Sequence, residues 1–496
     1  MSDTTVFTPA STPESAGIPS QAVRRFVERL DTERICMHGF LLVRHGKVAA
    51  EGYWSPYSGD SMHRMYSVSK SFVSLAVGLM VDQGKMHLDD QVVKFFSDKQ
   101  PEQVHPYLES ATVRDLLMMA TPHNSTTYTR TDKDWAWTFF NKIPSHPPGT
   151  IFSYDTSATV TLTTIVERIS GLPFLEYMRP FLLDPIGFSP DAWCIQCPEG
   201  TSWGGSGVIC TLRDMAKVAW VCMNGGRWGS RQLLPEGYVQ AATSKQIDNS
   251  LGGNRGYGYQ IWREKDNGFA FRGMGSQLAI CYPDKDFLFA CTADTQGADL
   301  NKEGGRRGIL DAMRQELYAE LSDAALPANP GAHRSLERKI GTLTILPQDG
   351  ARKSAMAGRI DGTWYAMADN PMGIERMRLV FDGDEGTWEY TNAQGDNRLR
   401  FGIGGMVAGE FPQRNYFGPR IGTAPGTPYR CLASAAWVEP HKLDMLIYIT
   451  DHYLGSLRIS MAFKNDEVSV LMVKAAEWFL DEYQGFAGGA VAGAQH

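Results

Sequence analysis

Ser67 and Lys70 stand three residues apart, in the segment that runs from Met65 to Phe72. Residues at this spacing share one face of a helix, so the serine hydroxyl and the lysine amine can meet. At the first turn of a helix the macrodipole disfavours the ammonium form, and a neutral lysine can take a proton from serine. The pattern therefore predicts an activated serine nucleophile. A serine that only caps the helix, with a solvated lysine, stays open as an alternative, because Ser-x-x-Lys arises by chance about once in a chain of this length.

Tyr154 and a glycine-rich segment could supply the other groups that such a nucleophile needs. Tyr154 precedes a predicted helix over residues 158–169. A phenol has a pKa near 10, and an adjacent ammonium group favours its anion, so Tyr154 and Lys70 could share one proton as a coupled base. At 271–277, small residues at the start of a strand would let a substrate carbonyl approach a backbone N–H group, completing an oxyanion hole with Ser67. A tyrosine that anchors its loop and a simple β-bulge are the plain alternatives.

The surrounding elements decide how these residues can be positioned. Residues 72–81 are apolar almost throughout, which predicts a core helix with Ser67 at the floor of a cleft. A hairpin turning at His45 and Gly46, a mainly helical block over 67–235, and strands near 257–262, 277–282 and 287–291 predict an α+β domain. Short strands recur after a Pro/Ala/Asn/Gly-rich break, and they predict an antiparallel sandwich or barrel. We therefore expect a domain at 1–325, a linker at 326–357 and an all-β domain at 358–496.

Composition narrows the classes of function. The chain has 496 residues, a net charge of −7 and no Lys/Arg-rich run, so we expect no nucleic-acid partner. The N-terminus has no signal-peptide pattern and no apolar run approaches the ~18 residues of a membrane span, which predicts a cytoplasmic protein without membrane contact. Eight scattered cysteines, with a single Cys-x-x-Cys at 194–197, predict neither a disulfide framework nor a metal site. We expect no cofactor.

The three segments, in this order, resemble the serine β-lactamase and penicillin-binding-protein superfamily. The resemblance runs from about residue 12 to residue 320 and includes the stretches 112–119 and 203–214. It is closest to the β-lactamase-related esterase and amidase branch, with its class C-like enzymes, family VIII esterases and D-aminopeptidases. It implies an antiparallel sheet flanked by helices, with a helical subdomain. The C-terminal region resembles the barrel or lipocalin-like appendages of some members.

The resemblance also implies roles for individual residues. Ser67 would be the acyl-accepting nucleophile, Lys70 and Tyr154 the acid/base pair, and the N–H groups of Ser67 and Met274 the oxyanion hole.

Two motifs depart from the family's usual pattern. Thr156 occupies the position where the second motif usually has Asn, and the third motif reads Phe271-Arg272-Gly273 where Lys or His, any residue and Gly are usual. We assign Thr156, Arg272 and Gly273 to substrate binding. The missing basic residue argues against efficient turnover of β-lactams.

The sequence thus predicts a serine hydrolase that cleaves a small ester or amide through an acyl-enzyme on Ser67. Two alternatives remain open: an acyltransferase that uses the same acyl-enzyme, and a non-catalytic scaffold or binding protein that retains the fold. The C-terminal domain could also build a homo-oligomer.

Overall fold

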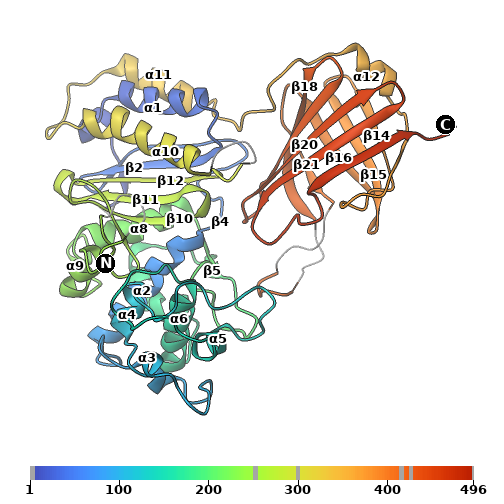
Figure 1. The fold of residues 1–496 in the computed structure, drawn as a ribbon. Coiled ribbons are helices and arrows are strands. Elements are labelled where there is room, and N and C mark those ends of the chain that lie inside the picture. The colour runs from blue at the N-terminus through green and yellow to red at the C-terminus, as the bar shows by residue number, and fades with distance from the viewer. Residues whose placement is uncertain (1–5, 250–254, 298–301, 413–417, 424–427, 494–496) are drawn as a thin grey trace.

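The computed structural model describes residues 6–249, 255–297, 302–412, 418–423 and 428–493, and it shows two domains (Figure 1). The N-terminal domain is built on a sheet with the strand order β1-β3-β2-β12-β11-β10-β9. Its strands are β1 Thr8–Pro9, β2 Met37–Arg44, β3 Lys47–Tyr53, β9 Trp262–Arg263, β10 Phe269–Gly273, β11 Gln277–Tyr282 and β12 Phe287–Ala293. All pairings are antiparallel except that of β1 with β3. Because β12 pairs with β2, distant parts of the chain form one sheet, as predicted for an α+β domain.

Helices cover both faces of this sheet. On one face lie α1 Ser20–Thr32, α10 Lys302–Ala312 and α11 Pro330–Ile340, and α1 packs against both of the others (Figure 1). On the other face α8 Leu212–Met223 packs against β2, β11 and β12. The helical region beyond α8 contains α2 Ser69–Asp82, α3 Pro106–Glu109, α4 Val113–Leu117, α5 Trp135–Asn141, α6 Thr156–Ser170, α7 Phe174–Met178 and α9 Glu236–Thr243. The short strands β4 His63–Arg64, β5 Trp193–Cys194 and β6 Val208–Cys210 form a small separate sheet beside it. Within the residues that the structure describes, every helix is too short or too polar to cross a membrane.

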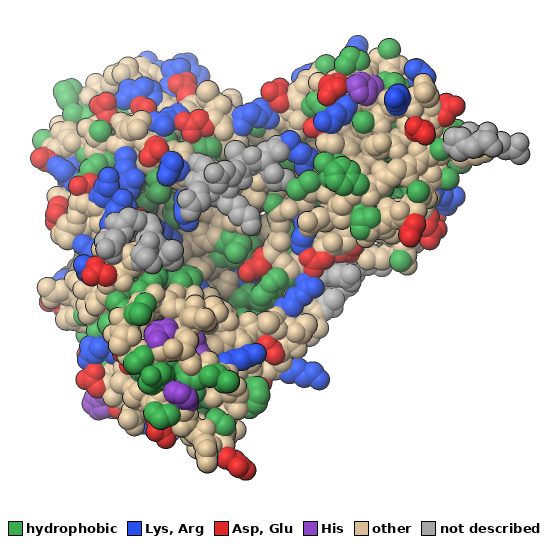
Figure 2. Space-filling view, in the orientation of Figure 1, with side chains coloured by type: hydrophobic (Ala, Val, Ile, Leu, Met, Phe, Trp, Pro, Cys, Tyr) green, Lys and Arg blue, Asp and Glu red, His purple; other side chains and the backbone are tan. Residues whose placement is uncertain are grey.

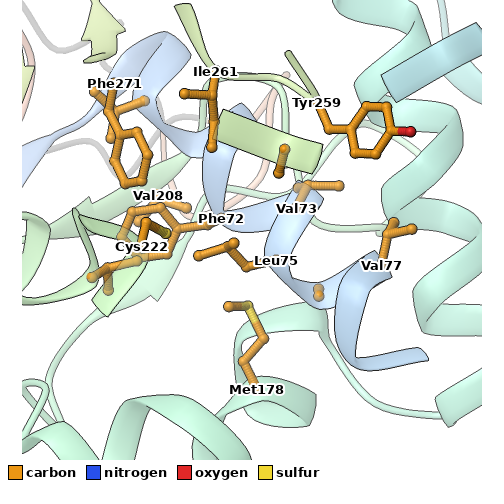
Figure 3. Close-up of a cluster of buried hydrophobic side chains, with 14 of the residues drawn as sticks. Phe72, Val73, Leu75, Val77, Met178, Val208, Cys222, Tyr259, Ile261 and Phe271 are labelled. Atoms are coloured by element: carbon orange, nitrogen blue, oxygen red, sulfur yellow. The ribbon is translucent and has the colours of Figure 1, made fainter. Parts of the chain in front are cut away.

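Helix α2 is the central helix of the N-terminal domain. Phe72, Val73, Leu75 and Val77 are buried, and Figure 3 shows them among side chains from the surrounding elements, such as Met178. A helix that is apolar on all sides is stable only inside a core, since burial of each large aliphatic side chain contributes about 1.5–3 kcal/mol. This packing fixes the start of α2, and the predicted nucleophile Ser67 lies in the turn directly before it.

The C-terminal domain is a closed barrel, which decides between the two predicted all-β architectures. Its strands are β13 Tyr365–Met367, β14 Arg376–Asp382, β15 Glu385–Asn392, β16 Gly395–Ile403, β17 Val407–Phe411, β18 Tyr429–Glu439, β19 Lys442–Ile449, β20 Gly455–Lys464, β21 Glu467–Ala476 and β22 Gly485–Val491. A parallel pairing of β16 with β18 closes the antiparallel sheet. Alternate residues point inward, and large side chains such as the stacked rings of Trp388 and Tyr390 fill the interior. The predicted α+β domain and all-β domain are both confirmed.

The predicted linker at 326–357 contains a helix. Helix α11 occupies Pro330–Ile340 and packs on α1, with Leu336 buried. The Pro-Gly pair that suggested a break instead starts the helix: Pro330 takes the first helical position, and the Asn329 side chain accepts a hydrogen bond from the Ala332 N–H at 3.1 Å. The short helix α12 Ala355–Ile360 then leads into the barrel.

The two domains meet in an aromatic contact. Trp203 of the N-terminal domain stacks on Trp478 of the barrel, with ring centroids 5.3 Å apart and planes within 1° of parallel. Trp135 also meets Trp478 edge to face. These rings belong to the same hydrophobic cluster as the barrel interior, so the barrel is packed against the helical region.

Candidate active site

Ser67 and Lys70 meet at the start of α2. Ser67 lies in a 3₁₀ turn at Tyr66–Val68 that runs directly into α2, and Lys70 is the second residue of that helix. The Lys70 Nζ donates hydrogen bonds to Ser67 Oγ at 3.0 Å and to the Gly205 carbonyl at 2.6 Å. The lysine is 1% exposed, and burial lowers its pKa to about 7, although the charges of Glu477 and Asp155 oppose this shift. A lysine with this pKa is neutral in a large fraction of molecules near neutral pH.

Gly205, whose carbonyl accepts from Lys70, packs closely against Thr156. A Cβ at this position would lie 2.5 Å from the Thr156 Cγ2. Thr156 is the first residue of α6, and its backbone N–H donates to Thr126 Oγ1 at 3.0 Å. The structure thus places Thr156 against Gly205, whose carbonyl accepts a hydrogen bond from Lys70.

Tyr154 reaches Ser67 from the loop before α6. Its ring stacks on Trp262 with centroids 5.5 Å apart, and the ring centroid lies 5.1 Å from Lys70 Nζ. Burial raises the pKa of the phenol to about 12, although a hydrogen bond from Ser67 opposes this rise. Tyr154 is therefore protonated at neutral pH, so Lys70 rather than the phenol is the available base in the resting site.

Asp155 holds this loop in place from the inside. The carboxylate is fully buried, caps α6 through the Ser157 N–H at 2.8 Å, and accepts a hydrogen bond from Thr121 Oγ1 at 2.9 Å. Burial raises its pKa to about 6. The side chain thus connects the loop of Tyr154 to the segment that follows α4.

Removing this cap is expected to destabilise the protein. The change Asp155→Ala deletes the cap of α6 and removes the carboxylate that accepts from the buried hydroxyl groups of Ser157 and Thr121, which costs about 2 kcal/mol or more of unfolding free energy. Urea unfolding of the two proteins at pH 7.5 measures the difference. The matched control is Ser354→Ala, which removes the N-cap of the half-exposed helix α12 and is expected to cost about 1 kcal/mol or less. An equal loss in both variants would contradict the buried role of Asp155.

The end of β10 lies against the backbone that precedes Ser67. A Cβ on Gly273 would collide with the carbonyl oxygen of Met65, so only glycine permits this approach. Met274 follows in a short turn whose next residue, Gly275, has a φ of 71°. The structure therefore brings the Met274 segment beside Ser67, as an oxyanion hole made by two backbone N–H groups requires.

Arg272 is engaged by a carboxylate. Its guanidinium forms an ion pair with Glu264, whose side chain is fully buried and also pairs with Arg255 at 3.3 Å and Arg314 at 3.2 Å. The same guanidinium lies 5.4 Å from the ring centroid of Trp262, the residue that stacks on Tyr154. Trp262 thus contacts both Arg272 and Tyr154.

Several residues at the site were not predicted from the sequence. Gly205 accepts a hydrogen bond from Lys70, and Asp155 is the residue after Tyr154. An Asp directly before a predicted helix is a typical N-cap, so this pattern could have identified Asp155 from the sequence. Arg64 and Glu477 form an ion pair at 2.9 Å whose charges act on Lys70, and Glu477 comes from the barrel.

In the described part of the chain, no group of three His, Cys, Asp or Glu side chains could hold a metal ion, and Cys194 and Cys197 are free thiols.

Comparisons with known proteins agree with this fold. The family model described as Beta-lactamase matches residues 23–313, more than half of the chain. A curated relative, the 6-aminohexanoate-dimer hydrolase of Paenarthrobacter ureafaciens, is 25% identical over 229 residues, which cover 42% of this chain and 57% of the relative. The chain thus spans less than two thirds of the length of that relative.

Solved structures share the fold at low sequence identity. A Bacillus anthracis protein provisionally assigned as a 6-aminohexanoate-dimer hydrolase has a TM-score of 0.51 and 18% identity, covering 66% of this chain and 90% of its own. A penicillin-binding-protein homologue from Caulobacter crescentus has a TM-score of 0.50 and 17% identity, covering 61% and 97%. The predicted resemblance is confirmed at the level of the family. The chain belongs to the beta-lactamase family.

Proposed function

We propose that this protein is a serine hydrolase that cleaves a small ester or amide through an acyl-enzyme on Ser67. The observation that carries the proposal is the 3.0 Å hydrogen bond between the Lys70 Nζ and the Ser67 Oγ. Burial lowers the pKa of Lys70 to about 7, which makes the amine a competent base beside the hydroxyl that it must activate.

The reaction follows from the protonation states of the three side chains. Ser67 Oγ attacks the substrate carbonyl and gives its proton to neutral Lys70. The backbone N–H groups of Ser67 and Met274 stabilise the oxyanion. Tyr154 donates its phenolic proton to the leaving alcohol or amine and recovers a proton from the Lys70 ammonium. Water then attacks the acyl-enzyme and gives a proton to Lys70, and Lys70 returns that proton to Ser67 Oγ as the bond to the acyl group breaks and the acid departs.

Aromatic side chains beside Tyr154 support an apolar group on the substrate. Phe152, Tyr257 and Trp262 pack against one another with centroids 4.9 to 6.0 Å apart, and Trp262 stacks on Tyr154. The name of the Paenarthrobacter relative describes a hydrolase of a small dimer, which supports a small substrate here. Thr156, Arg272 and Gly273 remain our candidates for binding it. The homo-oligomer through the barrel and the cytoplasmic location also remain predictions, the first of which size-exclusion chromatography with light scattering would test.

Covalent labelling of Ser67 tests the proposal. Intact mass spectrometry after incubation with a fluorophosphonate probe is expected to show one probe-sized mass gain in the wild type and none in Ser67→Ala. The matched control is Ser58→Ala, which changes a serine on an exposed loop and is expected to label like the wild type. A folded wild type that forms no adduct and turns over no p-nitrophenyl ester would favour the non-catalytic scaffold. Product formation that rises with added alcohol or amine, at the expense of hydrolysis, would identify an acyltransferase.

A further inference from the structure

The barrel contacts both segments that form the proposed oxyanion hole. Resting on the proposed function, we propose that the barrel is a working part of the active site: its loop at 452–454 positions the residues that flank the two oxyanion-hole N–H groups. Figure 2 shows hydrophobic side chains gathered in the hollow between the two domains. Tyr66 and Leu454 are therefore positioning residues that act on catalysis without touching the substrate.

The first contact holds the residue before the nucleophile. Tyr66 is 1% exposed and has a φ of 49°, a conformation that a bulky L-residue adopts only when its surroundings impose it. The backbone N–H of Leu454 donates a hydrogen bond to the Tyr66 hydroxyl at 2.9 Å. The side chain of Tyr66 is thus fixed by the barrel, and its backbone conformation sets the direction of the Ser67 N–H that follows.

The second contact lies on the other side of the proposed hole. Gly275, which follows Met274, has a φ of 71°, and a Cβ placed on it would collide with Leu454 Cδ1. Leu454 is 5% exposed, so it fills the space above this turn. One barrel residue therefore contacts both neighbours of the oxyanion donors: Tyr66 through its N–H group and Gly275 through its side chain.

A second set of barrel contacts holds the strand that leads to Ser67. The Arg64 N–H donates to the His452 carbonyl at 2.9 Å, and the Arg64 guanidinium pairs with Glu477 at 2.9 Å. That guanidinium is 1% exposed and lies 4.3 Å from the ring centroid of Tyr66. It also donates to the Ser206 carbonyl at 2.9 Å, next to the Gly205 carbonyl that binds Lys70.

These contacts predict a specific kinetic effect. A displacement of about 1 Å in a catalytic group costs about 10²-fold in rate, whereas binding of the ground-state substrate depends on other surfaces. Loosening the loop should therefore lower kcat and leave KM nearly unchanged. Loosening the loop should also weaken the binding of an alkylboronic acid, because this inhibitor bonds to Ser67 Oγ and places a boronate oxygen in the oxyanion hole.

The experiment uses the full chain with Tyr66→Phe and, separately, Leu454→Ala. Each is expected to lower kcat about tenfold to a hundredfold, with KM within about twofold and a parallel loss of boronic acid affinity. The control Asp481→Asn breaks the Arg130–Asp481 ion pair, which links the same two domains through half-exposed side chains at 2.7 Å. It is expected to keep wild-type kcat and boronic acid affinity.

The outcomes separate this inference from the proposed function. Wild-type kcat and boronic acid affinity in Tyr66→Phe, in a protein that Ser67→Ala inactivates, would overturn the role of the barrel and leave the hydrolase intact. Absence of an adduct and of turnover in the wild type would overturn both. Tyr66→Phe removes a single oxygen atom, so it decides the question even if Leu454→Ala fails to fold.

Discussion

Replacing Lys70 with arginine is expected to lower kcat/KM by about 10³-fold. Arginine keeps the positive charge and the hydrogen-bond donors beside Ser67, but it stays protonated at every accessible pH and cannot take the serine proton. The measurement is steady-state turnover of a p-nitrophenyl ester, with circular dichroism to confirm folding. The matched control is Lys217→Arg, because burial also lowers the pKa of Lys217, which donates to the Gly187 carbonyl away from Ser67. Lys217→Arg is expected to retain wild-type turnover, and an active Lys70→Arg would exclude Lys70 as the base.

The pH profile of the wild type follows from the same lysine. Because the pKa of Lys70 is about 7, kcat/KM is expected to rise with pH through about 7 and to level off above it. The free energy of unfolding should change in the same direction. The unfolded chain has a lysine pKa near 10.4 and binds more protons than the folded chain between pH 7 and 10, so the contribution of Lys70 to stability rises across that window. A kcat/KM that is flat from pH 6 to 8 would contradict this assignment.

Most of what could be predicted about the site came from the spacing of residues that are close in the sequence. Ser67 and Lys70 meet because both belong to one continuous helical segment, and three residues of separation fix their geometry wherever that segment lies. The partners that come from distant parts of the chain have no such signal. Gly205 accepts from Lys70 across 135 residues, and Glu477 reaches Arg64 from the barrel, so both depend on tertiary packing that no local pattern encodes.

The fold shows the same division between local and distant information. Alternating strands after residue 360 predicted an all-β domain, but its closure rests on the parallel pairing of β16 with β18, which the alternation does not specify. Helix α11 was not predicted within the linker, because proline and glycine are typical of loops in some contexts and of helix starts in others. The Asn329 cap distinguishes the two cases only once its hydrogen bond is seen.

Replacing Tyr154 with phenylalanine is expected to lower kcat for an alkyl amide by about 10²–10⁴-fold, the usual contribution of a general acid. The ring remains stacked on Trp262, so KM should change little. The loss should be far smaller for a p-nitrophenyl ester, because its leaving group departs as a stable anion and needs no proton. Comparing the two substrates therefore isolates proton donation from any effect on the position of Ser67.

The control for this experiment is Tyr177→Phe. Burial raises the pKa of Tyr177 to about 12, as it does for Tyr154, but Tyr177 lies in α7 and makes no contact with Ser67 among the described interactions. Tyr177→Phe should leave kcat for both substrates unchanged. An equal loss for amide and ester in Tyr154→Phe would show that the phenol orients Ser67 instead of protonating the leaving group. In that case Lys70 would have to deliver the proton itself, which its position 3.0 Å from Ser67 Oγ allows.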